Sequence, residues 1–513
     1  SGGACVRFGA GRDAGARVVV ADLVHARHMS APRIAILGAG LSGMCMGIRL
    51  LRAGIGSFTI FEKDERVGGT WRDNVYPGVC CDVPSHLYSY SFELNPDWTR
   101  TFSPGWEIQE YCERTAQKYG LGPHLRLRAE VTHVEYLGSE WCIHFADGSE
   151  VRADFVVSGL GALHQPSVPK LSGAERFRGP SFHSAQWPRD VDLAGRRVGV
   201  VGSAASAIQI VPEIAPAAEH VTVFQRTPNW ILPRNDRAYP QWLKTAFRRV
   251  PGLQRLYRLW IYLLLEWRVL AFQQGSRLGG ALERLCRAHI AKEVADPDLR
   301  AKVTPDYRPG CKRILVSDDY FDAIQRDDVA LETSPIERVE ENGIVTADGR
   351  LHELDAIVYA TGFEPFSLLS PLVVTGRDGR RLDDTWASGI EAHRTVAVAG
   401  YPNLFFLVGP NSGLGHNSII LMIEAQVGYV LACIRGALRP DGSIAQLEPR
   451  PAAEAAFGAD VQERLATTIW KSGCKSWYMD ERGRIYTLWP GSTLRYLWQM
   501  RRPVWSEYEI SVS

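Results

Sequence analysis

The sequence predicts an α/β protein that contains two parallel-sheet units in one chain. Two glycine-rich turns, residues 38–43 and 202–207, each follow a short apolar strand and open a helix. Each unit also closes in the same way, with a hairpin turn (147–148 and 348–349) and then a buried strand that ends in glycine. The chain of 513 residues is long enough for two to four domains of roughly 100–200 residues each.

The first turn reads G-A-G-L-S-G and carries Gly38, Gly40 and Gly43. It lies between the strand 33–37 and a helix that ends near residue 54, and a second strand then ends at Glu62. The glycines allow a tight turn, close approach to a pyrophosphate, and close packing of helix on strand. The helix N-terminus offers N–H donors to phosphate, and the acid suits a ribose hydroxyl. This order predicts a Rossmann-like dinucleotide-binding domain.

The second turn reads G-S-A-A-S-A and carries Gly202, Ser203 and Ser206. Ala204 and Ala207 replace its second and third glycines. A methyl group preserves the turn but keeps the backbone further from a phosphate. We therefore expect a second Rossmann-like domain with a looser nucleotide site.

The strand after the second turn leads to Arg226, at the same offset from Gly202 as Glu62 has from Gly38. An acid at this place suits a free ribose hydroxyl, whereas an arginine can grip a 2′-phosphate. Arg226 therefore favours NADP(H), and the alternative is a solvated surface arginine.

The extra length of the second unit lies mostly between residues 235 and 310, where apolar and arginine residues recur at helical spacing. We expect a helical insert there. The predicted layout is an N-terminal extension, disordered or non-native, at 1–28; an FAD-binding domain at 31–165 and 390–513; an NADP-binding domain at 166–234 and 328–389; and the insert at 235–327.

The composition predicts a cytoplasmic protein, monomeric or homodimeric, with no metal site. The net charge of +1 gives no sign of a nucleic-acid or membrane-surface partner. The ten cysteines lack paired metal spacing, so we expect free thiols, and the N-terminus shows no secretory signal. The apolar run 259–265 is too short for a membrane span. We expect it to be a buried or dimer-facing helix, with a lid against a lipid-like substrate as the alternative.

Between the two turns, residues 177–188 read F-R-G-P-S-F-H-S-A-Q-W-P. This segment resembles the fingerprint F-x-G-x-x-x-H-x-x-x-W-P of the type I Baeyer–Villiger monooxygenases, and the resemblance extends from residue 33 to about 497. It assigns Phe177, Gly179, His183, Trp187 and Pro188 to the segment that couples domain motion to flavin chemistry.

Other segments resemble the same family. Y-P-G-V-C-C-D implies that Asp82 is an active-site acid that also contacts cofactor, and C-K-R implies a catalytic Arg313 beside an NADP-contacting Lys312. S-W-Y implies that Trp477 lies near the substrate and nicotinamide. The remaining matches, G-G-T-W and Q-R-T-P, continue the flavin cradle and the NADP site: Gly69, Thr70, Trp71, Arg226 and Thr227.

The resemblance implies an enzyme that uses FAD, NADPH and O2 to convert a small-molecule ketone to an ester or lactone through a peroxyflavin. The alternatives are a flavin-containing monooxygenase that oxidises sulfur or nitrogen, and a nucleotide-binding redox sensor without turnover. The adjacent Cys80 and Cys81 lack the spacing of a disulfide reductase. The sequence does not specify which ketone is used.

Overall fold

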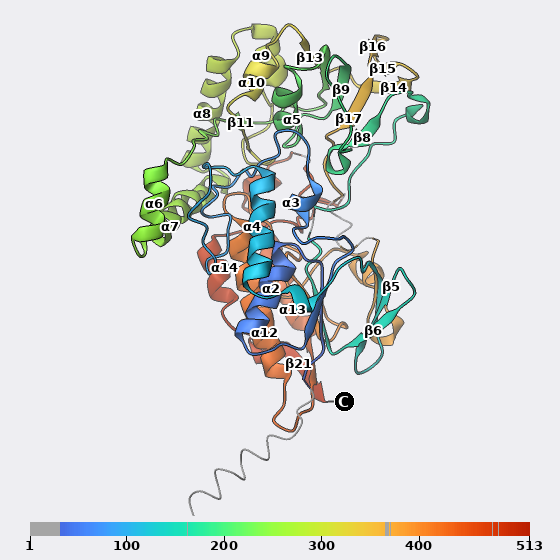
Figure 1. Ribbon diagram of the computed structural model, residues 1–513, viewed down its shortest axis with the longest axis vertical. Helices are drawn as coiled ribbons and strands as arrows, with labels where there is room; N and C mark the ends of the chain where they lie inside the picture. Colours follow the sequence, from blue (N-terminus) through green and yellow to red (C-terminus); the bar gives the residue numbers. More distant parts are fainter. Residues whose placement is uncertain are drawn as a thin grey trace, which may run out of the picture.

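The computed structural model describes residues 31–161, 163–364, 369, 371–474, 476–480 and 482–512. The predicted extension 1–28 lies outside these residues. Two sheet units lie one above the other in Figure 1, with the first unit below and the second above. The predicted class, α/β with two parallel sheets, is confirmed.

The first unit is built on a five-stranded parallel sheet of order β19-β7-β1-β2-β3. All four residues of β1 and of β7 are buried, as expected for the centre of a sheet covered on both faces. Its elements are β1 (Ile34–Leu37), β2 (Phe58–Phe61), β3 (Leu125–Arg126), β7 (Phe155–Ser158), β19 (Leu404–Phe406), and the helices α2 (Leu41–Arg52), α3 (Thr70–Asp73) and α4 (Gly105–Lys118).

The second unit repeats this plan with the order β13-β10-β9-β17-β8, again parallel. Its edge strand β8 (Ser181–His183) comes from the middle of the 177–188 motif. This short segment is extended because it pairs with the edge of the sheet, where Phe182 lies opposite Val358 of β17. The other elements are β9 (Arg197–Val201), β10 (His220–Phe224), β13 (Val329–Glu332), β17 (Ala356–Tyr359) and α5 (Ala207–Ile214).

As predicted, an antiparallel hairpin comes before the buried strand β7 of the first unit and β17 of the second, and both hairpin glycines, Gly148 and Gly349, have φ of 81°. β18 (Val373–Thr375) pairs with β4 of the first unit, although the predicted boundary of 390 places it in the second. The chain therefore returns to the first unit earlier than expected. The strands are β4 (Val131–Tyr136), β5 (Trp141–Phe145) and β6 (Glu150–Ala153), and β14 (Ile336–Glu340), β15 (Gly343–Thr346) and β16 (Leu351–Glu353).

Helices fill the stretch predicted as a helical insert. Between the paired strands β11 (Ile231–Leu232) and β12 (Leu315–Val316) lie α6 (Gln241–Arg249), α7 (Leu253–Glu266), the 3-10 helix η4 (Trp267–Phe272), α8 (Arg277–Glu293) and α9 (Pro297–Val303). The short helix α10 (Tyr320–Ala323) follows β12. Of the two expectations for the run 259–265, burial within the chain is wrong for four of its seven residues, and a dimer-facing helix stays a prediction. Ile261 and Leu265 are buried and Tyr262 is half-buried, whereas Leu259, Trp260, Leu263 and Leu264 are exposed.

The rest of the chain completes the first unit: α11 (Leu382–Trp386), α12 (Ile419–Ala437), β20 (Ala445–Pro449), α13 (Pro451–Ala466), α14 (Thr493–Gln499) and β21 (Tyr508–Val512). Among the helices of the described ranges, α12 alone has the length and apolar composition of a membrane span. More than half of that stretch is buried inside the protein, and α12 contributes to the same core as α2.

Candidate active site

The first glycine turn forms a tight cradle at the N-terminus of α2. Gly38 has φ of 92°, and its N–H donates to Phe61 O at 2.8 Å. A Cβ on Gly43 would lie 1.9 Å from Gly38 O, so only glycine fits where helix meets strand. The buried Glu62 is held by the Ala39 N–H, which donates to its Oε2 at 2.8 Å. The predicted acid therefore sits beside the turn, as a ribose partner should.

The G-G-T-W segment packs against this turn. Gly69 has φ of 53°, and a Cβ there would lie 3.2 Å from the Cα of Gly40. Thr70 and Trp71 begin α3, and Trp71 Nε1 donates to Tyr88 Oη at 3.2 Å. The absence of side chains on Gly40 and Gly69 lets the two backbone turns approach closely, which fits a cradle for a flavin dinucleotide.

In the second turn, Gly202 is the position that requires glycine. Its φ is 114°, and a Cβ would lie 2.5 Å from Ala360 O at the end of β17. Ser203 Oγ donates to Thr227 O at 3.2 Å, which joins the turn to the end of β10. Ser206 precedes the helix α5, and Ala207, its first residue, is fully buried.

Arg226 and Lys312 bring two positive charges to this nucleotide turn. Arg226 is exposed at the end of β10, and Lys312 comes from the far end of the insert, with its Nζ 4.7 Å from the Tyr307 ring centre. Burial lowers the pKa of Lys312, and the charge of Arg226 lowers it further. The fold therefore places beside the predicted phosphate-binding arginine a second cation, which fits a 2′-phosphate.

Asp82 and Arg313, 231 residues apart in the chain, form an ion pair between the two units. Arg313 donates to Asp82 Oδ2 from Nε at 2.8 Å and from Nη2 at 2.5 Å. The charge of Asp82 raises the pKa of Arg313 above its usual value, against the opposing effect of burial. The Arg313 side chain keeps 35% of its surface exposed, so this permanent cation remains accessible.

The loop that carries Asp82 is held by the second unit through Gln209 of α5. Gln209 Oε1 accepts from the Tyr76 hydroxyl at 3.0 Å, and its Nε2 donates to Cys80 O at 3.2 Å. A Cβ on Gly78 would lie 2.4 Å from Gln209 O. Sequence reasoning missed Gln209, because no motif marks it and only the docking of the two units gives it a role.

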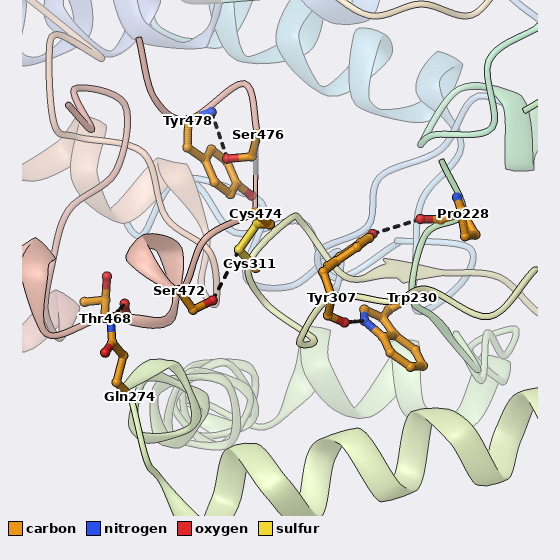
Figure 2. Close-up of a disulfide and its surroundings, with 10 residues drawn as sticks. All are labelled: Pro228, Trp230, Gln274, Tyr307, Cys311, Thr468, Ser472, Cys474, Ser476 and Tyr478. Atoms are coloured by element: carbon orange, nitrogen blue, oxygen red, sulfur yellow. Dashed lines mark hydrogen bonds between the residues drawn. A yellow bond between two sulfur atoms is a disulfide. The ribbon is translucent and has the colours of Figure 1, made fainter. Parts of the chain in front are cut away.

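Cys311 and Cys474 form a disulfide, with Cα atoms 6.3 Å apart (Figure 2). The expectation of free thiols is wrong for this pair, because the fold brings together two cysteines that are 163 residues apart. The other described cysteines are free, including Cys80 and Cys81. The bond joins the Lys312–Arg313 loop to the C-terminal segment that carries Trp477.

The same loop is anchored on its other side to the second unit. Trp230 Nε1 donates to Tyr307 O at 2.7 Å, and the Tyr307 hydroxyl donates to Pro228 O at 3.0 Å (Figure 2).

Tyr478 is buried, and its pKa is raised to about 12 by burial, with the charge of Arg313 opposing. Trp477 is 43% exposed, and its ring centre lies 4.6 Å from that of Tyr478. Arg313 and Trp477 are thus brought into one region.

The residues of the 177–188 motif fasten the edge of the second sheet. His183 is buried, which lowers its pKa, and its Nδ1 accepts from the Ala185 N–H at 3.1 Å. A Cβ on Gly179 would lie 2.2 Å from Asp355 O. The Trp187 ring packs edge-on against Phe182, with centres 5.0 Å apart. Phe177 packs into a small core of the second unit, and Pro188 is half-buried.

A cavity of about 660 Å³ lies beside the loop that precedes Asp82. It is lined from the first unit by Trp71, Tyr76 and Cys80, and from the chain after β11 by Arg234 and Asp236. Neither member of the Asp82–Arg313 pair lines it. The accessible cation, rather than this cavity, therefore marks the candidate reacting centre.

Comparison with known proteins places this geometry in a family. Residues 31–257 match the family model described as flavin-binding monooxygenase-like. A Baeyer–Villiger monooxygenase of Pseudomonas aeruginosa is 46% identical over 92% of this chain and 89% of its own. One of Streptomyces coelicolor is 44% identical over 93% of this chain and 92% of its own.

A solved structure, the OTEMO complex with FAD and NADP, is 27% identical with a TM-score of 0.82, and the match covers 94% of this chain and 99% of that one. The cradle at Gly38 fits FAD, and the cations at the second turn fit NADPH. The chain belongs to the family of FAD- and NADPH-dependent Baeyer–Villiger monooxygenases.

Proposed function

We propose that Arg313 is the catalytic cation of this enzyme and that Asp82 holds it in position. The observation that carries the proposal is their two-bonded ion pair at the junction of the two units. The substrates are a small-molecule ketone and O2, and the product is an ester or lactone. We also propose that the enzyme is cytoplasmic. The FAD-binding domain resumes at β18, before residue 390, because β18 pairs with β4.

The bound flavin would supply hydride acceptance from NADPH and the activation of oxygen. The residues Gly38, Gly40, Gly43, Glu62, Gly69, Thr70 and Trp71 would hold it. The second nucleotide would be held by Gly202, Ser203, Ser206, Arg226, Thr227 and Lys312, with Trp477 near its nicotinamide.

Arg313 supplies a fixed positive charge where oxygen atoms gain negative charge during the reaction. An arginine does not lose its proton at working pH, and the charge of Asp82 raises its pKa further. Asp82 accepts from Nε and Nη2, so it orients the planar guanidinium and prevents it from swinging away. Such a preorganised cation stabilises a developing oxyanion without reorganisation at the moment of reaction.

The test compares Arg313→Ala and Arg313→Lys with the unchanged enzyme. We expect both variants to bind FAD and to accept hydride from NADPH in stopped-flow measurements. Ester formation should fall on the order of a hundredfold or more in Arg313→Ala. Ester formation at the unchanged rate in that variant would remove Arg313 from the mechanism.

The substrate class is tested on a panel of linear, cyclic, aryl and steroidal ketones, with products identified by mass. A thioether assayed beside them tests the runner-up chemistry of sulfur oxidation. Turnover of the thioether with no ketone product would replace the proposed reaction.

A further inference from the structure

The outward face of α7 is apolar. Leu256, Trp260 and Leu264 are 64%, 57% and 53% exposed, and Leu259 and Leu263 are about equally exposed. These positions recur every three or four residues, so they form one continuous stripe along the helix. A stripe of this kind is normally turned toward a protein core.

The inward face of the same helix carries two polar side chains, Gln254 and Arg258, beside the buried Ile261 and Leu265. Arg258 is buried and donates from Nη1 to His86 O at 2.7 Å and to Leu87 O at 3.1 Å. The buried Gln254 donates from Nε2 to Asn95 O at 2.7 Å. Rotating α7 to hide its apolar stripe would break these bonds and leave buried polar groups unpaired. The fold therefore holds the apolar face outward.

The exposed apolar surface continues on neighbouring elements. The C-terminal end of α7 is joined to α14, because Glu266 Oε2 accepts from Thr493 Oγ1 at 2.6 Å. The helices α6, α7, α8 and α14 gather on one side of the molecule (Figure 1). The large exposed apolar side chains of these helices and of the residues that link them, beyond the α7 stripe, are Trp242, Val250, Trp267, Leu270, Leu278, Leu285, Leu494 and Trp498.

The same segment is strongly basic, although the whole chain has a net charge of only +1. Residues 241–293 hold three acidic residues, Glu266, Glu283 and Glu293, and ten basic ones, of which Lys244 and Arg258 are buried. The eight exposed basic residues are Arg248, Arg249, Arg255, Arg268, Arg277, Arg284, Arg287 and Lys292. Three of these side chains already pair with acids: Arg248 with Asp97, Arg287 with Glu283, and Lys292 with Glu293. The other basic residues, which the chain-wide net charge does not reveal, favour an anionic partner.

We propose that this insert face, the α7 stripe with its apolar neighbours and basic rim, docks the enzyme on an anionic phospholipid surface. Leucine and tryptophan side chains would enter the interface between headgroups and acyl chains, and the arginines would pair with lipid phosphates. A second copy of the chain fits this face less well. A symmetric dimer places the same patch against itself, so it would oppose one basic surface to another.

The proposal is tested by vesicle flotation of the flavin-loaded enzyme. One set of vesicles is phosphatidylcholine alone, and the other contains about a third phosphatidylglycerol. We expect at least about tenfold stronger partitioning onto the anionic vesicles at about 0.15 M salt, and much weaker partitioning at about 0.5 M.

Matched variants identify the face. Trp260→Ser/Leu263→Ser/Leu264→Ser should lose most of the partitioning, and Arg255→Glu/Arg284→Glu should lose the preference for anionic vesicles. The control Leu137→Ser/Val168→Ser/Ile510→Ser removes side chains that are 45%, 49% and 40% exposed elsewhere, and should partition normally. Flavin absorbance and melting temperature check that each variant is folded.

Three results would overturn the proposal. They are no partitioning onto anionic vesicles, equal partitioning of the folded α7 variant and the unchanged enzyme, or a dimer in sedimentation that the α7 variant converts to monomer. The last result would assign the face to a second copy of the chain.

Discussion

Single residues in this enzyme act through charges that are brought together from distant parts of the chain. Arg313 gains its fixed orientation from Asp82, and Arg226 gains a second cation, Lys312, beside it. In both cases one member of the pair, Arg313 or Lys312, lies in the C-terminal part of the insert. The residue type sets the chemistry of each side chain, whereas its orientation and local charge depend on the partner that the fold places beside it.

The first prediction concerns Arg226. Arg226→Ala should lower kcat/KM for NADPH by about 10- to 100-fold, because a charge-assisted bond to the 2′-phosphate is lost. The value for NADH, which lacks that phosphate, should hardly change and serves as the internal control. Steady-state oxidation of both nucleotides measures the ratio. An equal fall for NADPH and NADH would show that Arg226 acts on something other than the phosphate.

Among the elements, the loop that leads to Asp82 and the helix α5 are in close contact across the two units. Gln209 binds both Tyr76 and Cys80, and Gly78 lets the backbone approach the helix. The position of Asp82 therefore depends on how the second unit docks.

The second prediction tests this joint with Gly78→Ala. The change adds a methyl 2.4 Å from Gln209 O at a φ of 79°, so the loop must move away from α5. We expect a loss of about 1–3 kcal/mol in the free energy of unfolding, and slower flavin reduction by NADPH.

Gly148→Ala is the matched control, because Gly148 has nearly the same φ of 81° but open space around its Cβ position. It should show the backbone strain alone. Thermal unfolding and stopped-flow reduction measure the two effects, and equal behaviour of both variants would contradict a special role for the loop–helix contact.

The third prediction concerns the joint between α7 and the first unit, where His86 is buried. Burial, assisted by the charge of Arg258, lowers its pKa from 6.5 to about 3. The aromatic rings of Tyr239, Phe247 and Tyr257 surround it, and the amide of Gln254 is 3.1 Å from its Nδ1.

Since the unfolded chain takes up the His86 proton at higher pH than the folded one, acid favours unfolding. The free energy of unfolding is therefore highest above pH 6.5 and falls as the pH drops toward 3. At pH 5 the protonation of His86 in the unfolded chain should already lower it by about 2 kcal/mol. Urea unfolding at a series of pH values measures the slope. His86→Asn should be less stable at pH 7 and should show a smaller slope between pH 6.5 and 4; an unchanged slope would exclude His86 as its source.

At the scale of the whole molecule, the chain passes from the first unit to the second and back again, and a disulfide links its later segments. Cys311 and Cys474 join the end of the insert to the C-terminal segment, next to Arg313 on one side and close in sequence to Trp477 on the other. The bond therefore ties two predicted parts of the reacting centre to each other.

The fourth prediction concerns this bond. Cys474→Ser should lower the free energy of unfolding by about 2–4 kcal/mol, because a cross-link that closes a long loop restricts the unfolded chain. We also expect more NADPH oxidation without ester formation, since Trp477 is held less firmly. Dithiothreitol should lower the free energy of unfolding of the enzyme without substitutions, and should have little effect on that of the variant. A stability insensitive to reductant in the unchanged enzyme would contradict the prediction.

The sequence by itself determined the two parallel-sheet units, both nucleotide turns and the residue types of the reacting centre. These are local features, because a turn at Gly38 or Gly202 and the strands beside it depend on residues close in the chain. The family resemblance added the identities of Asp82 and Arg313, and their roles stay predictions that the variants above test.

Only the tertiary structure decided which distant residues meet. Three contacts depend on how separate elements dock. They are the contact of Gln209 in α5 with the Asp82 loop, the bond between Cys311 and Cys474, and the pairing of β18 with the first unit. The outward apolar face of α7 has the same origin: its periodicity predicts an amphipathic helix, but the buried bonds of Arg258 decide which face points to solvent. Periodicity identifies two faces of a helix, whereas docking determines which one is buried.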